Sequence, residues 1–362
     1  MKDFMMHPIE EKIRKRLMNL PSFVAEYIYR MENDREVQTL FEYTKDLHLF
    51  FEFLHQHDLF PSSSIESITI EQLALVQERD ILDFLQYIKS YDKTHDTTSG
   101  KRLTTHYRNS DSGRSRKLAT IHRFFADMEK RRLIPLDPSK HLDIKVNKRA
   151  KIKNRLSTEQ IEHFFSVITE DVKAESSQEQ AFHKKLKYRD YIMVLVLAYT
   201  GIRISELVQL DTDDIHLSDD ETNLLVVVRK GGDEEVIPIS DQVAGEIKEY
   251  LEYRKTLTAL PLKQHENAIF LSLQKKRINP KTVRQTLEKY RLRSGIDIKI
   301  TPHVFRRTFG TNHYNLFEDM YLTAQILGHS SAETTRKFYA DPDSERVAKS
   351  MQGFKYERRS ED

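Results

Sequence analysis

Apolar residues recur at helical spacing in three segments of the first part of the chain. These segments cover residues 39–54, about 70–91 and about 116–130, and each places large aliphatic and aromatic side chains three or four positions apart. Positions with that spacing form a stripe along one side of an α-helix. We therefore expect three helices that bury their apolar stripes in a shared core.

The second part of the chain is mainly helical in pattern, with one pair of short strands. Residues 191–199 are apolar almost all round, as expected of a helix in the centre of a core, and Gly201 follows as its C-terminal cap. Two aliphatic runs, 224–228 and 236–239, flank a turn with two glycines, which is typical of a β-hairpin. Further helices are expected over about 241–256, 280–293, 302–316, 319–327 and 331–339. The pattern predicts a mainly α protein with a small β-hairpin or sheet.

Two polar stretches interrupt these elements. Residues 92–113 are rich in Ser, Thr, Gly and charge with almost nothing to bury, so we expect a loop. Residues 146–155 are strongly basic and lead into a capping box, Ser157 to Gln160, that opens a new helix. Because 362 residues are enough for two hydrophobic cores, residues 146–156 are predicted to link two domains.

The net charge of +2 conceals an uneven distribution. Residues 99–155 hold 17 Lys and Arg against 5 Asp and Glu, so this segment carries +12 and the remainder −10. Positive charge gathered in one segment is typical of nucleic-acid binding, although a solvated helix face has the same composition. The candidate phosphate contacts are Lys101, Arg102 and Arg108 in the predicted loop, Arg114, Arg116, Lys117 and Arg123 on or near the third helix, and Lys148, Arg149, Lys151 and Lys153 in the linker.

Composition also excludes some classes of protein. The chain has no cysteine, which excludes disulfides, thiol catalysis and zinc sites built on thiolates. No apolar run approaches the roughly 20 residues of a membrane span, and residues 1–30 lack the pattern of a signal peptide. We expect a soluble, cytoplasmic protein without membrane contact.

The strongest chemical pattern lies near the C-terminus. After a helix start signal at Thr301-Pro302, His303 and Arg306 lie one helical turn apart, and His329 and Tyr339 follow. A tyrosine can supply an oxygen nucleophile, arginines can hold a dianionic transition state by bidentate hydrogen bonds, and histidines can move or steady protons. These residue types suit attack on a phosphate diester, a reaction that requires no metal or other cofactor.

Upstream segments add further groups of the same kind. The segments are Thr200-Gly-Ile-Arg203-Ile-Ser-Glu206-Leu207 and Arg229-Lys230-Gly-Gly-Asp. Together with His303-Val-Phe-Arg306, Leu327-Gly-His329 and Tyr339 they resemble the tyrosine recombinase (phage integrase) family, from about residue 157 to 345. The family box reads roughly His-x-x-Arg, Leu-Gly-His and Tyr, and its first arginine sits in a Thr-Gly-Leu-Arg-x-Ser-Glu-Leu segment.

The resemblance implies a domain plan and a role for each residue. It implies a helical core DNA-binding domain over 1–145, a basic linker over 146–156, and a mostly helical catalytic domain with a C-terminal tail over 157–362. The implied catalytic set is Arg203, Lys230, His303, Arg306, His329 and Tyr339. In the family the tyrosine forms a 3′-phosphotyrosine and the lysine protonates the departing 5′ oxygen. Glu206, one helical turn after Arg203, is expected to orient Arg203 or His303.

One spacing departs from the family pattern. The usual interval between the second histidine and the nucleophile is nine residues, whereas His329 and Tyr339 are ten apart. Phe338 stands at position nine and has no hydroxyl group. We therefore expect Tyr339 to be the nucleophile, with a one-residue adjustment of the helix or loop before it.

The resemblance further implies partners and a biological role. The expected partners are a double-stranded DNA recombination site, three further copies of the chain in a homotetramer on two such sites, and a DNA translocase as activator. Residues 20–27, 39–43 and 229–232 are similar to the Xer branch of the family and its single-protein chromosome dimer resolvases. Chromosome dimer resolution is therefore the expected role.

Three alternatives remain open at this point. The first is a simple mobile-element recombinase of the integrase or excisionase type. The second is a catalytically idle DNA-binding protein, against which the complete set of catalytic residue types argues. The third is a monomeric type IB topoisomerase, which relaxation of a supercoiled plasmid without any special site would favour.

Overall fold

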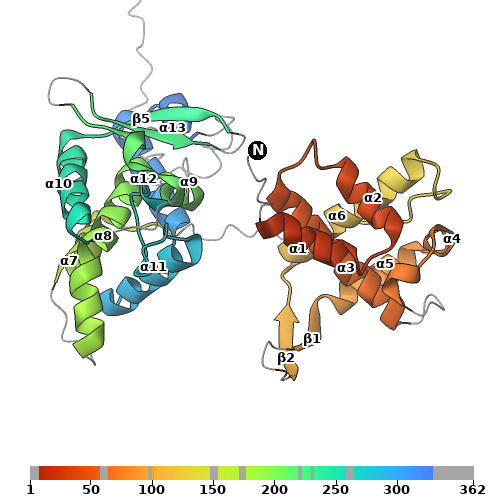
Figure 1. Cartoon of the computed structure of the whole chain (residues 1–362). Helices are drawn as coiled ribbons and strands as arrows, with labels where there is room; N and C mark the ends of the chain where they lie inside the picture. The colour runs from red at the N-terminus through yellow and green to blue at the C-terminus, as the bar shows by residue number, and fades with distance from the viewer. Residues whose placement is uncertain are drawn as a thin grey trace, which may run out of the picture. The chain divides into compact units, whose positions relative to one another are not determined.

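The computed structural model of the chain describes residues 8–57, 64–96, 100, 102–146, 154–170, 177–218, 222–229, 232–257 and 265–328. The chain divides into two compact units, Met1–Arg149 and Ala150–Asp362 (Figure 1). The division falls inside the stretch expected to be a linker, of which residues 147–153 lie outside the described residues. Among the described residues both units are mostly helical and each has one small sheet, which confirms the expected fold class.

The first unit packs its helices around a core of aromatic rings. Its elements are α1 (Pro8–Leu17), α2 (Ser22–Arg30), α3 (Val37–Gln56), α4 (Ile70–Leu73), α5 (Glu78–Tyr87), β1 (Ser90–Asp96), β2 (Arg102–Arg108) and α6 (Asp111–Lys130). Phe50 and Phe51 of α3 are fully buried and meet Phe125 and Phe124 of α6 edge to face. Such pairs add about 0.5–1.5 kcal/mol each beyond burial. The long helices α3 and α6 are therefore the centre of this unit.

The segment expected to be one helix over about 70–91 is two helices and the start of a strand, so that expectation was wrong. Helix α4 ends at Leu73 and α5 begins at Glu78. The backbone N–H of Gln77 donates to the Asp80 carboxylate at 2.8 Å. This cap starts a new helix although the apolar periodicity continues across the break.

The polar stretch expected to be a loop forms an antiparallel hairpin, so that expectation was also wrong. Tyr91 of β1 lies opposite Tyr107 of β2, and their rings stack with centroids 5.3 Å apart. The hydroxyl groups of Thr94 and Thr104 lie 3.0 Å apart. Pairs of side chains across the strands stabilise this ribbon, and none of the side chains whose burial is described is buried. The alternation of apolar residues therefore does not reveal it.

A buried carboxylate joins α3 to α6. Asp46 is 3% exposed and accepts hydrogen bonds from both terminal nitrogens of Arg116, at 2.8 and 2.9 Å, and from the Thr120 hydroxyl at 3.0 Å. The Nζ atom of Lys117 lies 3.8 Å from the same carboxylate. Burying a charge without such partners is costly, so the network specifies how the two central helices meet.

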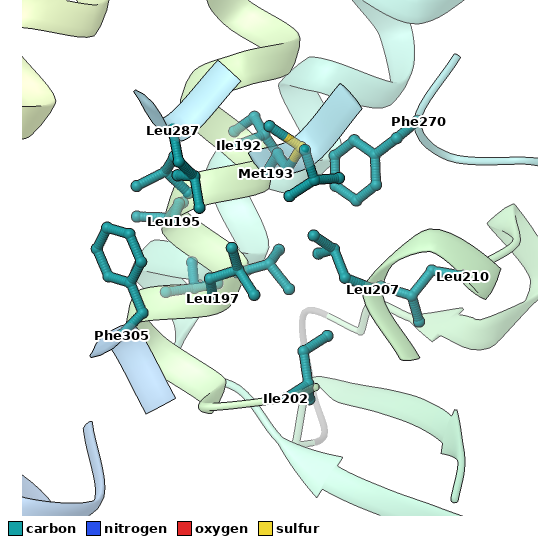
Figure 2. Packing of buried hydrophobic residues seen from close by; sticks show 14 of the residues in the cluster. Ile192, Met193, Leu195, Leu197, Ile202, Leu207, Leu210, Phe270, Leu287 and Phe305 are labelled. Carbon is teal, nitrogen blue, oxygen red and sulfur yellow. The ribbon is translucent and has the colours of Figure 1, made fainter. Parts of the chain in front are cut away.

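The second unit surrounds its central helix with further helices and a three-stranded sheet. Its elements are α7 (Thr158–Thr169), α8 (Ser177–Thr200), α9 (Ile204–Gln209), β3 (Ile215–His216), β4 (Leu224–Val228), β5 (Glu234–Pro238), α10 (Asp241–Leu257), α11 (Pro280–Ser294), α12 (Pro302–Phe317) and α13 (Met320–Ile326). Ile192 and Leu197 of α8 are fully buried, and Leu207, Leu287 and Phe305 bring α9, α11 and α12 into the same cluster (Figure 2).

The predicted elements that fall on described residues of this unit are largely confirmed, and the helix expected over about 331–339 lies outside them. The capping box at Ser157 opens α7, and the hairpin expected over 224–239 is the antiparallel pair of β4 and β5. The third strand, β3, has two residues and pairs with the other edge of β4. Within the described ranges, no helix combines the length and the apolar composition needed to cross a bilayer.

Replacing Asp46 with alanine should lower the free energy of unfolding by roughly 2–3 kcal/mol, because Arg116 and Thr120 lose hydrogen bonds to a charged group. The matched control is Asp83→Ala, since Asp83 lies in an exposed pair 3.8 Å from Arg79 and should change stability by less than about 0.5 kcal/mol. Urea unfolding of the full chain, followed by circular dichroism, measures both. Equal effects of the two substitutions would contradict a structural role for Asp46.

Candidate active site

Arg203 and Glu206 lie at the start of α9 and bind each other. The backbone N–H of Arg203 donates to Oε2 of Glu206 at 2.7 Å, and its Nη1 donates to Oε1 at 2.7 Å. Glu206 is 4% exposed. Burial alone would raise the pKa of this carboxyl, but the hydrogen bonds from Arg203 and the charge of Arg229 hold the pKa below its usual value. Glu206 therefore orients Arg203, and within the described residues it makes no hydrogen bond to His303.

Arg306 extends from α12 toward the segment that contains Arg203. Its Nη1 donates to the carbonyl oxygen of Gly201 at 2.7 Å, and its Nη2 donates to the carbonyl oxygen of Leu327. The Nη2 atom of Arg203 donates to the next carbonyl along the chain, that of Gly328, at 3.1 Å. The two arginines therefore lie against consecutive peptide groups, although 103 positions separate them in the sequence.

The start of α12 sets the direction of its functional side chains. The Thr301 hydroxyl accepts from the backbone N–H of Val304 at 3.3 Å, and Pro302 occupies the first turn, as the sequence predicts. His303 and Arg306 follow at positions i and i+3 and share a helix face. Arg306 is 4% exposed, whereas His303 is exposed to solvent.

The surroundings of His303 disfavour its cationic form. Partial desolvation of the ring lowers the pKa of His303, and the charges of Arg306, Arg307 and Arg203 act in the same direction. The imidazole is therefore neutral near pH 7. A neutral imidazole among guanidinium groups can accept a proton while the arginines hold an anion.

Two glycines make the close approach of these segments possible. Gly201 has φ +62°, and a Cβ atom there would lie 2.6 Å from Cδ1 of Phe309. Gly328 has φ +58°, and a Cβ atom there would lie 2.5 Å from Nε of Arg229. Both positions combine left-handed backbone with no room for a side chain. The glycines of the Thr-Gly-Ile-Arg and Leu-Gly-His segments are thus packing requirements of the site.

Arg229, at the end of β4, belongs to the site although the sequence reasoning assigned it no role. Its Nη1 donates to Oε2 of Glu206 at 2.8 Å, its Nε to Glu235 at 2.5 Å, and its Nη2 to the carbonyl oxygen of Ile326 at 2.9 Å. Burial alone would lower the pKa of Arg229, but its bonds to Glu235 and Glu206 raise it.

A signal for this arginine is present in the sequence. Leu225 and Val227 of β4 are 0% and 1% exposed, and alternate residues of a strand share one face. Arg229 continues that series and is 8% exposed. A cation on the apolar face of a strand needs buried partners. The alternation of side chains along β4 therefore predicts that Arg229 is buried.

The remaining catalytic candidates, Lys230, His329 and Tyr339, lie outside the described residues. Arg307, which follows Arg306 directly, donates to the carbonyl oxygen of Asn154 at 3.2 Å. Tyr321 of α13 is 79% exposed.

The predicted phosphate contacts fall into three groups. Arg102 and Arg108 are exposed on β2. The cations of α6 have partners within the first unit: Arg114 binds Asp111 and the carbonyl oxygen of Leu85, Arg116 and Lys117 lie against Asp46, and Arg123 binds the Tyr43 hydroxyl. Lys101, Lys148, Arg149, Lys151 and Lys153 lie outside the described residues.

Comparison with known proteins identifies the family of this chain. The model of the phage integrase family matches residues 154–346, which is more than half of the chain. The chain belongs to the phage integrase family. The matched range contains every candidate catalytic residue from Arg203 to Tyr339, and the protein is accordingly a tyrosine recombinase.

Individual tyrosine recombinases are similar over much of their length. XerS of Lactococcus lactis subsp. cremoris (strain MG1363) is 24% identical over 343 residues, covering 90% of this chain and 93% of that protein. XerD of Proteus mirabilis is 31% identical over 235 residues, covering 64% of this chain and 69% of that protein.

Solved structures share the fold of this family member. XerH, in a pre-cleavage complex with its difH substrate, has a TM-score of 0.61 at 20% identity, covering 86% of this chain and 79% of that chain. A Tn1549 transposon integrase fragment, in complex with transposon right end DNA, has a TM-score of 0.62 at 20% identity, covering 91% of this chain and 98% of that chain.

The His303 imidazole should titrate below the ordinary histidine pKa of about 6.5. Because the folded-state pKa is lowered, the stability contributed by the neutral ring is complete above the ordinary pKa and is lost as the pH falls through the lowered value. NMR titration of the ring measures this directly. Arg307→Gln should raise the pKa, and Lys276→Gln, an exposed lysine on another segment, should leave it unchanged. A wild-type pKa at or above the ordinary value would show that the arginines do not disfavour the imidazolium form.

Proposed function

We propose that this tyrosine recombinase cleaves and rejoins double-stranded DNA at a specific site, and that Arg203 and Arg306 hold the scissile phosphate. The observation that carries the proposal is their convergence: they donate to the consecutive carbonyl groups of Leu327 and Gly328, with His303 beside them. Guanidinium groups fit phosphate oxygens in pairs and stabilise the charge that develops during displacement at phosphorus.

The proposed chemistry balances without an energy source. In the first step the hydroxyl oxygen of Tyr339 attacks phosphorus, the bond from phosphorus to the 5′ oxygen breaks, and a 3′-phosphotyrosine remains. The tyrosine proton passes to neutral His303, and Lys230 gives a proton to the departing 5′ oxygen. In the second step the 5′ hydroxyl of a partner strand displaces Tyr339. One ester bond forms for each that breaks, so ATP is not consumed.

His329 and Glu206 complete the proposed site. We assign His329, which follows Gly328 directly, to hydrogen bonding with the phosphate. Glu206 acts on Arg203 and has no contact with substrate in this scheme. The roles of Lys230, His329 and Tyr339 rest on their places in the family pattern.

The proposed partner is duplex DNA, as it is for the XerH and Tn1549 integrase complexes. We assign the DNA-binding core to residues 1–145, the linker to 146–156 and the catalytic domain to 157–362. Arg102 and Arg108 are exposed on β2 and are candidates for phosphate contact. The α6 cations have partners inside the unit, which favours a structural role for them.

We propose chromosome dimer resolution as the biological role. Similarity to XerS extends over 90% of this chain and 93% of that protein, and this supports the proposal. Two rounds of strand exchange between two sites require four nucleophiles, hence a homotetramer, with a DNA translocase as the expected activator. A mobile-element integrase is the second candidate, and the sequence that the enzyme cleaves distinguishes the two.

The chain should form a denaturant-resistant covalent adduct with a nicked suicide duplex that carries its site, and Tyr339→Phe should form none, because phenylalanine lacks the nucleophilic oxygen. Candidate duplexes carry chromosome-terminus sequences or element ends. Denaturing gel electrophoresis of labelled DNA measures the adduct. Tyr321→Phe is the matched control, since Tyr321 is 79% exposed and should leave adduct formation unchanged.

The outcomes separate the competing functions. An adduct on a chromosome-terminus site supports dimer resolution, and an adduct on an element end supports the integrase alternative. Wild-type protein that binds these duplexes and forms an adduct with none of them would contradict the proposal and favour the idle DNA-binding protein. An adduct that persists in Tyr339→Phe would assign the nucleophile elsewhere.

A further inference from the structure

Arg229 connects three segments that carry the candidate site. From the end of β4 its three guanidinium nitrogens donate separately to Glu206 on α9, to Glu235 on β5 and to the Ile326 carbonyl at the end of α13, at 2.8, 2.5 and 2.9 Å. The residue is 8% exposed. A single buried cation therefore fixes α9, the β4–β5 hairpin and the end of α13 against one another.

The packing around this guanidinium also sets the path of the backbone. At Gly328 a Cβ atom would lie 2.5 Å from Nε and 2.7 Å from Cζ of Arg229. The carbonyl oxygen of the same Gly328 accepts the hydrogen bond from Arg203. The position of that carbonyl, and of the neighbouring Leu327 carbonyl that binds Arg306, therefore depends on contact with Arg229.

We propose that Arg229 is a positioning residue for DNA cleavage, which acts on the scissile phosphate through Arg203 and Arg306 and does not touch it. Through Glu206 it fixes the guanidinium of Arg203, and through Ile326 and Gly328 it fixes the carbonyl groups against which both arginines lie. The inference rests on the proposed function, in which these two arginines hold the phosphate.

The electrostatics give the expected consequence of losing Arg229. Oε1 of Glu206 accepts from the guanidinium of Arg203, and Oε2 accepts from the guanidinium of Arg229 and from the backbone N–H of Arg203. Without Arg229 a buried carboxylate would keep one guanidinium partner, and Arg203 would turn to bind both of its oxygens, as bidentate arginine–carboxylate pairs do. Donors of Arg203 would then be withdrawn from the phosphate. The cleavage step should suffer, while DNA binding should persist.

Single-turnover cleavage of a suicide duplex, with protein in excess, separates the cleavage step from binding. Arg229→Lys keeps the charge and loses the planar fork, and Arg229→Gln keeps donors and loses the charge. Each should slow adduct formation by roughly 10–100-fold, the range for residues that orient catalytic groups. The Kd for the duplex should stay within about threefold of wild type, because contacts spread over many phosphates supply most of the affinity.

Arg254 provides the matched control for loss of a buried arginine. It is also 8% exposed, and it donates to the carbonyl oxygens of Ala268 and Glu266. Arg254→Lys and Arg254→Gln should lower the melting temperature of the protein. Their cleavage rates should stay within about threefold of wild type, because Ala268 and Glu266, to which Arg254 donates, are not part of the proposed site.

A double-mutant cycle tests whether Arg229 acts through Glu206. If it does, the loss in Arg229→Gln combined with Glu206→Gln should be smaller than the sum of the two single losses, since both variants remove one shared interaction. Fully additive losses would overturn the inference, as would Arg229 variants that cleave like wild type or a parallel loss of cleavage in the Arg254 variants. These results would leave the proposed function standing. Wild-type protein that binds duplexes and forms no adduct would overturn the proposed function, and this inference with it.

Discussion

The carboxylate of Glu206 lies buried between the guanidinium groups of Arg203 and Arg229, and the geometry of the site depends on this pairing. Burying a carboxylate is costly unless cations and N–H donors surround it, and here they come from the start of α9 and the end of β4. Bonds from the same two arginines reach the carbonyl groups of Ile326 and Gly328. The fold therefore aims Arg203 in advance of any ligand, which is the condition for electrostatic stabilisation of a transition state.

Local signals in the sequence were sufficient to locate most helices and to single out two arginines of the candidate site. Apolar periodicity located α3, the cap at Ser157 located the start of α7, and the two-glycine turn located the pair of β4 and β5. Residue spacing singled out Arg203 and Arg306, and in the structure the two side chains lie against the consecutive carbonyl groups of Gly328 and Leu327. These features depend on neighbours within a few positions, which a single sequence displays directly.

The features that escaped prediction depend on partners distant in the chain. Arg116 was expected to face phosphate, and its bidentate partner Asp46 lies 70 positions earlier. The hairpin of β1 and β2 is stabilised by contacts such as the stacked rings of Tyr91 and Tyr107, and its sequence has no alternation of apolar residues that would predict it. Arg229 follows the burial pattern of its strand, but the neighbouring sequence does not indicate that Glu206 is its partner. Such features depend on contacts between residues that are distant in the sequence.

The central claim is that Arg203 and Arg306 neutralise one scissile phosphate, and charge removal on the DNA tests it most directly. Replacing one non-bridging oxygen of that phosphate with a methyl group removes its negative charge. Wild type and Arg203→Ala are compared in single-turnover cleavage of the unmodified duplex and of this methylphosphonate duplex. The cleavage rate of Arg203→Ala should be lower than that of wild type by roughly 100-fold or more on the unmodified duplex and by less than about tenfold on the methylphosphonate duplex. An equal loss on the two duplexes would contradict the claim.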